Sequence, residues 1–221
     1  MAEVAAIAGP SGSGKSTSIK DLNPEETYLI NTSGKSLPFK GSSKLYNTDN
    51  KNYYEPTGIL DVLAKMKTVS EKAPHIKQIV IDDSNYLQTF NMMAKAMETG
   101  YTKFTLLARD IVTLVQDAKK LRDDLIIYYI SHTEAVEDGD DIVSYKLKTI
   151  GKMLDNQVVM EGLFTIVLYT HIECKGDDCK YYFVTNKYGK YLSKSPYGMF
   201  NELKIPNNLQ VVSDTIREYY N

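Results

Sequence analysis

The segment Gly9–Thr17, GPSGSGKST, constrains the fold of this chain more than any other segment. It fits the pattern G-x-x-x-x-G-K-[ST] and follows a strand-like apolar run at residues 4–8. Glycines let the backbone curl so that successive N–H groups point inward, and a helix beginning near Lys15 adds its positive end. A glycine-serine turn that matched by accident would lack this strand-to-helix context. We therefore predict a phosphate-binding loop formed by Gly9, Pro10, Ser11, Gly12, Ser13, Gly14, Lys15, Ser16 and Thr17.

Three side chains of this nucleotide-binding P-loop have separate expected roles. Lys15 would reach the β- and γ-phosphates and act in catalysis, and Ser16 would offer its hydroxyl to Mg²⁺. Thr17 would meet the α-phosphate. The expected cofactors are therefore ATP and Mg²⁺.

An acidic pair follows the apolar strand expected at residues 76–81. Asp82 is predicted to hold Mg²⁺ through water, and Asp83 is placed to polarise the attacking water as a catalytic base. The alternative is an ordinary strand end at which Asp83 and Ser84 cap the next helix. A cap and a base predict the same residue, so both interpretations of Asp83 stay open.

His132 follows another apolar strand, expected at residues 125–130. In P-loop ATPases with an extra strand between the P-loop strand and the acidic strand, the tip of that strand faces the γ-phosphate. His132 would donate a hydrogen bond there and report the presence of the γ-phosphate. The alternative is a structural histidine, which is also what we expect of His75 and His171.

Strand-like and helix-like segments alternate along the 221 residues, which predicts an α/β fold with a mostly parallel sheet in a single domain, residues 1–221. Helices are expected at 57–70, 84–98, 103–121 and 208–220, and further strands at 27–31, 163–172 and 180–185, the last two forming a hairpin. Residues 32–56 are expected to form a long surface loop, and the acidic residues 134–141 a solvated loop.

The composition limits the kinds of partner and the cellular compartment that we expect for this protein. The formal net charge of −2 argues against strong, autonomous binding to nucleic acid, and no apolar run is long enough to span a membrane. With only Cys174 and Cys179, the chain has no disulfide framework, so a cytoplasmic location is expected. Two cysteines make a weak case for zinc, and we expect them on a hairpin turn.

Four segments together resemble the bacteriophage RecA-like-core P-loop ATPases, which include the AAA-type ATP-binding proteins of single-strand-annealing recombination: GPSGSGKST, IKQIVIDDSNYL, LIIYYISHTE and TNKYGKYLSKSPYGMF. The resemblance implies a RecA-like three-layer α/β/α sandwich with a C-terminal hairpin extension. It also implies an ATP hydrolase that forms a head-to-tail homo-oligomer and acts on single-stranded DNA in phage recombination or replication, in the cytoplasm of the bacterial host. Contact with DNA would be weak, or would depend on a partner such as a single-strand-binding protein.

In such assemblies a basic residue of the next subunit completes the nucleotide site. Lys190 and Lys194, in GKYLSKSP, are the positions that the resemblance assigns to this catalytic role. The alternative is a solvated, lysine-rich loop. RecA itself places a catalytic glutamate after its second strand, where this chain has Asn31–Lys35. Either Asp83 substitutes for that glutamate, or hydrolysis is slow.

Two other functions stay open at this point. A small-molecule or nucleotide kinase also begins with a P-loop, but such enzymes usually clamp their phosphates with several arginines, and this chain has only Arg109, Arg122 and Arg217. In the second alternative, ATP binding organises an assembly without turnover.

Overall fold

The computed structural model describes residues 1–94, 97, 102–149 and 158–221. Its strands are β1 (Glu3–Gly9), β2 (Thr27–Asn31), β3 (Tyr53–Tyr54), β4 (Gln78–Asp82), β5 (Ile126–Asp138), β6 (Asp141–Leu147), β7 (Ile166–Lys175), β8 (Asp178–Val184) and β9 (Lys204–Pro206). Its helices are the 3-10 turns η1 (Ser16–Asp21) and η2 (Met160–Leu163) and the α-helices α1 (Ser42–Leu45), α2 (Ile59–Lys72), α3 (Asn85–Ala94), α4 (Thr102–Ala118) and α6 (Leu209–Tyr220). The predicted end of the helix after residue 94 lies outside the described residues.

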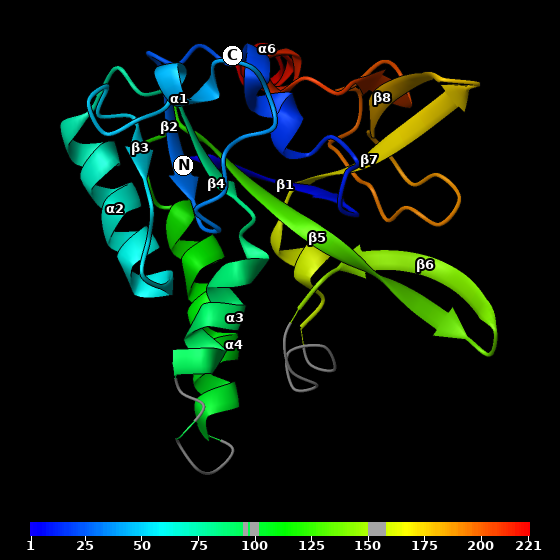
Figure 1. Ribbon diagram of the computed structural model, residues 1–221, viewed down its shortest axis with the longest axis horizontal. Coiled ribbons are helices and arrows are strands. Elements are labelled where there is room, and N and C mark those ends of the chain that lie inside the picture. The colour runs from blue at the N-terminus through cyan, green and yellow to red at the C-terminus, as the bar shows by residue number, and fades with distance from the viewer. Residues whose placement is uncertain (95–96, 98–101, 150–157) are drawn as a thin grey trace.

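One nine-stranded sheet, in the order β3-β2-β4-β5-β1-β7-β8-β9, runs through the molecule, with β6 paired to the outer half of β5 (Figure 1). Strands β3, β2, β4, β5, β1 and β7 run parallel to one another, and β8 and β9 continue the sheet in antiparallel register. The fold is α/β, as predicted. Strand β5 lies between β1 and β4, so an extra strand separates the P-loop strand from the acidic strand.

Helices cover both faces of the sheet because its strands are apolar on both sides. On β1, Ala6 and Ala8 belong to the core beneath α2, α3 and α4, whereas Ala5 and Ile7 belong to the core beneath η1 and α6. Both sets of side chains are fully buried. Continuous apolar strands of this kind are typical of parallel sheets between two helical layers. The layers leave the carboxyl ends of the strands free to form a site.

The acidic segment 134–141 is not the solvated loop that the sequence predicted. Strand β5 continues to Asp138 and pairs with β6 in an antiparallel hairpin, whose turn contains Gly139 at φ 62°. Near the turn of this hairpin, over residues 134–137 and 141–144, half-buried side chains alternate with exposed ones. The acidic residues hid this period-two pattern, although a glycine beside aspartates is a hairpin signal.

The segment 32–56 is better anchored than a free surface loop. Asn52 accepts a backbone hydrogen bond from Leu29, and its side-chain amide donates to the carbonyl groups of Pro24 and Leu45. Short elements α1 and β3 form within it, and β3 pairs with β2 at the edge of the sheet. These bonds fix the segment beside the strand ends.

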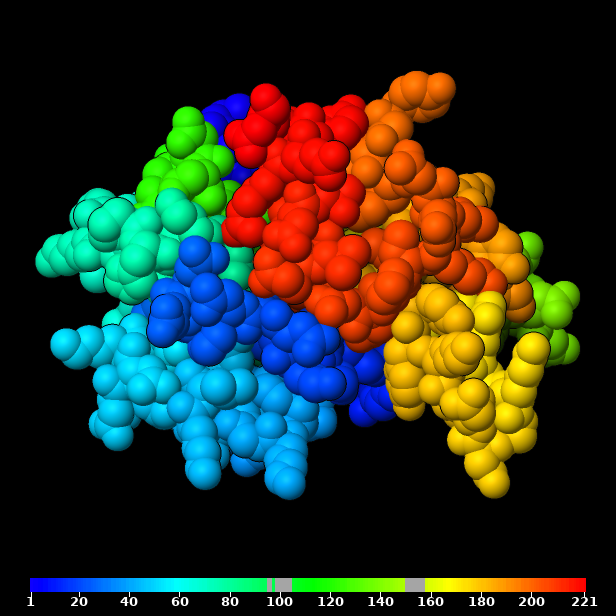
Figure 2. Space-filling model, turned by 90° about the horizontal axis from the view of Figure 1, so that it is seen from above, coloured from blue at the N-terminus to red at the C-terminus, as the bar shows by residue number. Residues whose placement is uncertain are grey.

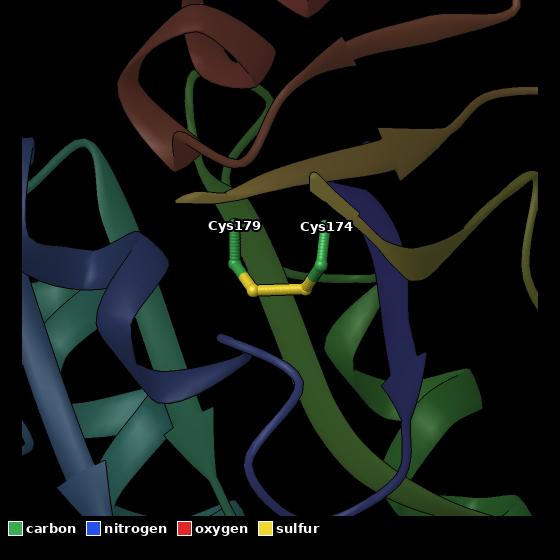
Figure 3. Close-up of a disulfide and its surroundings, with 2 residues drawn as sticks. All are labelled: Cys174 and Cys179. Atoms are coloured by element: carbon green, nitrogen blue, oxygen red, sulfur yellow. A yellow bond between two sulfur atoms is a disulfide. The ribbon is translucent and has the colours of Figure 1, made fainter. Parts of the chain in front are cut away.

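Strands β7 and β8 form the predicted hairpin, with Cys174 and Cys179 at paired positions. The two cysteines form a disulfide (Figure 3). The expectation that the chain has no disulfide is therefore wrong, whereas their place on a hairpin is as predicted. The two-residue turn at 176–177 sets the register that brings the two Cα atoms to 4.1 Å. A disulfide agrees poorly with the reducing compartment expected from the cysteine count.

Candidate nucleotide-binding site

The P-loop joins β1 to η1 and packs tightly against β7. A Cβ atom at Gly9 would lie only 1.8 Å from Thr170 Oγ1, so no larger residue fits there. Gly12 and Gly14 have φ values of 77° and 89°, a region that glycine enters without strain. The Ser13 hydroxyl donates to the Pro10 carbonyl oxygen at 2.7 Å and accepts from Thr170. These contacts give the loop its curled shape.

Helix η1 is a six-residue 3-10 turn rather than the α-helix that the motif predicts. The proline at residue 24 and the C-cap residue Leu22 in extended conformation end it early. Its short dipole contributes less to anion binding than that of a long helix. Loop amides and Lys15 must therefore provide most of the attraction for phosphate.

Lys15 is a buried cation at the centre of the loop. Its side chain donates to the Pro10 carbonyl oxygen at 2.7 Å, and the residue is only 5% exposed. Burial lowers the pKa of the Lys15 ammonium to about 8, although the nearby carboxylates of Asp83 and Asp82 oppose this shift. A buried ammonium with a neutral acceptor as its hydrogen-bond partner gains from a phosphate oxygen close by.

Ser16 and Asp82 lie side by side across the strand ends. The Ser16 hydroxyl donates to Asp82 Oδ1 at 2.8 Å, and Asp82 is buried. Burial and the charge of Asp83 raise the pKa of the Asp82 carboxyl to about 6, against the hydrogen bond from Ser16 and the charge of Lys15. One carboxylate and one hydroxyl are the oxygen ligands that proteins supply to Mg²⁺ at phosphate sites. The pair thus fits Mg²⁺.

In the described parts of the chain, no group of three or more His, Cys, Asp or Glu side chains could hold a metal by itself. Because Cys174 and Cys179 bond to each other, they do not form the weak zinc site considered from the sequence.

Asp83 sits at the turn between β4 and α3 in left-handed conformation, with φ 55°. The Thr32 hydroxyl contacts the carbonyl oxygens of Asp82 and Asp83 at 2.7 and 2.6 Å, which holds the turn in place. No side-chain cap from Asp83 to the helix was found among the hydrogen bonds of the described residues. The carboxylate faces His132 instead, which lies in the middle of β5 and not at the strand end that the sequence predicted.

His132 lies beside Asp83, with 3.4 Å between His132 Nε2 and Asp83 Oδ1. The register of β1 and β5 pairs Gly9 directly with His132, so the histidine also lies next to the start of the P-loop. Burial raises the pKa of the Asp83 carboxyl, but hydrogen bonds from His132 and Ser33 and the charge of Lys35 lower it on balance. Asp83 is therefore held ionised.

Lys35 is a site residue to which the sequence analysis gave no role. Its ammonium lies 3.9 Å from Asp83 Oδ2 and 5.0 Å from the centre of the Tyr86 ring. The Asn31 side chain donates to the Lys35 carbonyl oxygen at 2.7 Å and so fixes this part of the loop. The position of Lys35 shortly after the second strand could have indicated a site residue, because the carboxyl ends of parallel strands lie at one edge of the sheet.

Lys190 and Lys194 lie apart from this cluster. The Lys190 carbonyl oxygen accepts from the backbone of Tyr145 on β6, and Lys194 pairs through its backbone with Val167 on β7. Within the described residues, neither lysine forms an ion pair with the P-loop or the acidic pair. Their predicted role toward the site of a neighbouring subunit stays a prediction.

The fold and the site together define a nucleotide-binding α/β domain of the P-loop type. A family model described as "AAA domain" matches residues 2–197, and the chain belongs to this family. A search among curated proteins finds no match. None of the described helices is long and apolar enough to cross a membrane.

Proposed function

We propose that the protein is a Mg²⁺-dependent ATPase of phage DNA recombination or replication, which acts on single-stranded DNA as a head-to-tail oligomer. The observation that carries the ATPase part is the Asp83–His132 pair on neighbouring strands, next to Lys15 and the Ser16–Asp82 pair. The DNA and the oligomer parts rest on the resemblance of the four sequence segments.

The residues of the site have distinct roles in this proposal. Lys15 binds phosphate oxygens, and Ser16 and Asp82 hold Mg²⁺, which neutralises phosphate charge when bound. Asp83 is kept ionised, so its carboxylate accepts a hydrogen bond from water and orients it instead of removing a proton early. His132 steadies that carboxylate and lies where it can respond to the γ-phosphate.

The three arginines argue against the kinase alternative. Arg109 pairs with Asp110, Arg122 binds Asp124 and carbonyl groups, and Arg217 binds Gln78. None of these partners belongs to the P-loop or the acidic pair. A kinase that clamps a second phosphorylated substrate would need a free guanidinium at the site.

The test is steady-state ATP turnover with and without single-stranded DNA, for the wild type and Asp83→Asn. The variant should bind Mg²⁺-ATP normally and turn it over about 100-fold more slowly, because water loses its orienting group. DNA should stimulate the wild type, and added salt should reduce this gain. If Asp83→Asn turned over ATP at the wild-type rate, another residue would orient the water. If the wild type itself showed no turnover, the protein would be one in which ATP binding organises an assembly.

A further inference from the structure

The P-loop has a second flank, opposite the acidic pair, formed by β8 and the residues after β9. In the sheet order β4-β5-β1-β7-β8-β9, the metal and water-orienting groups lie on the β4–β5 side of β1. A nucleoside triphosphate is elongated, so a nucleotide with its γ-phosphate on that side extends its base toward the other side. Figure 2 shows the blue chain after β1 bordered there by the gold β7–β8 hairpin and by the orange-red chain leading into α6.

Tyr181 and Asn207 meet the P-loop on this second flank at the same residue. A Cβ atom at Gly14 would lie 2.9 Å from Tyr181 Cδ1 and 3.3 Å from Asn207 Oδ1. Both side chains therefore contact the glycine that precedes Lys15. Tyr181 is 44% exposed, so part of its ring is open for stacking.

Asn207 carries a polar group that has no partner. Its side-chain Nδ2 is buried and forms no hydrogen bond in the part of the chain that the structure describes. Leaving such a donor unpaired is costly, and most buried polar groups in proteins are satisfied. A donor of this kind beside a P-loop indicates a ligand with a matching acceptor.

Hydrogen bonds and an ion pair connect the backbone around these two residues. The backbone N–H of Asn207 donates to the Tyr181 carbonyl oxygen at 3.2 Å. The next residue, Asn208, caps α6 and donates from its side chain to Asp21 at the end of η1. Lys204 on β9 pairs with Glu173 on β7 at 2.5 Å. The backbone that carries the tyrosine and the amide is thus held in place before any ligand arrives, which favours binding.

We propose that Tyr181 and Asn207 form the nucleobase site of this protein and that it selects adenine. An amide presents one donor and one acceptor side by side, in either orientation of the group, and this matches the N6 and N7 edge of adenine. The corresponding edge of guanine has two acceptors and is best matched by arginine or lysine. The inference rests on the proposed function, since the P-loop must first bind the phosphates.

The test is calorimetric binding of Mg²⁺-ATP, Mg²⁺-GTP and inorganic tripolyphosphate to the full chain. The wild type should bind ATP at least about tenfold more tightly than GTP or tripolyphosphate. Asn207→Leu should remove the preference for ATP over GTP. Tyr181→Ala should weaken both nucleotides about tenfold through lost stacking. Neither variant should change binding of tripolyphosphate, which has no base.

Matched controls are Asn201→Leu and Tyr197→Ala, at exposed positions away from the loop. Both should bind all three ligands like the wild type. Equal affinity of the wild type for ATP and GTP, or unchanged ATP binding in Asn207→Leu and Tyr181→Ala, would overturn the base site. Failure of the proposed function would look different, because Lys15→Ala would then bind tripolyphosphate as tightly as the wild type does.

Discussion

Two buried ionisable side chains, Lys15 and Asp82, control the electrostatics of the site at the scale of single residues. Burial disfavours the charged form of each side chain, so it lowers the pKa of Lys15 and raises the pKa of Asp82. Such residues reduce the stability of the empty protein and are retained where a ligand needs them. This balance leads to two predictions.

Lys15→Ala should weaken Mg²⁺-ATP binding about 10- to 100-fold, since a charge-assisted hydrogen bond to phosphate is lost. The melting temperature of the nucleotide-free variant should be at least that of the wild type at pH 7.5, because burial penalises the Lys15 charge more than the nearby carboxylates stabilise it. Calorimetry and thermal unfolding measure the two effects. Lys20→Ala, at an exposed position on η1, serves as control. Equal affinity of the wild type and Lys15→Ala would contradict the P-loop assignment.

Asp82→Asn should stabilise the nucleotide-free protein at pH 7.5 and abolish Mg²⁺-dependent tightening of ATP binding. The Asp82 pKa is raised from 3.8 to about 6, so the folded state binds its proton more tightly than the unfolded state. Stability from this group therefore falls as pH rises from about 4 to about 6 and stays low above that. A shift of about two pKa units corresponds to roughly 3 kcal/mol.

Denaturant unfolding of both proteins at pH 4 and pH 7.5 gives the comparison. The stability gain of Asp82→Asn should be largest at pH 7.5 and shrink toward pH 4, where the wild-type carboxyl is largely protonated in the folded state. A gain that is equal at the two pH values would mean that burial of the charge is not its cause.

At the scale of elements, the close approach of β1 and β7 shapes the loop. Gly9→Ala should destabilise the protein by about 1–3 kcal/mol, because the new Cβ atom would lie 1.8 Å from Thr170 Oγ1. Adding Thr170→Ala should recover part of this loss, since the nearest remaining contact is then 2.6 Å, to the hydroxyl oxygen of Ser13. Gly162→Ala is the control, with its nearest neighbour at 3.9 Å. Denaturant unfolding that finds no loss in Gly9→Ala would show that the strands can separate freely.

The positions of helices and strands could be predicted where the apolar residues follow one regular spacing along the sequence. Strand β2 begins at Thr27 and ends at Asn31, as expected, and α6 begins one residue later than predicted. The β5–β6 hairpin was missed because acidic side chains on its exposed positions imitate a loop. The contacts of Lys35 with Asp83, and of Asn207 with Gly14, join residues far apart in the chain. Such contacts depend on strand order, which no local pattern contains.

At the scale of the whole molecule, the question is whether one chain forms a complete site. Lys190 is exposed and borders β6, and Lys194 is half-buried and borders β7. If either enters the site of a neighbour, ATP turnover per subunit should increase with protein concentration, because an isolated subunit lacks the second cation that a neighbour donates. Turnover measured over a dilution series, with mass determination in parallel, tests this expectation.

Mixing two inactive variants gives the sharpest test of this assembly. Lys194→Ala keeps an intact P-loop without the donated cation, and Lys15→Ala keeps the cation without a working P-loop. In an equimolar head-to-tail mixture, about a quarter of the interfaces join an intact P-loop to an intact donor, so about a quarter of wild-type activity should return. The same mixture with Lys190→Ala tests the other lysine, and Lys187→Ala, an exposed lysine nearby, is the control donor variant and should retain full activity alone. A rate that is independent of concentration, with no recovery in either mixture, would show that the site is completed within one chain.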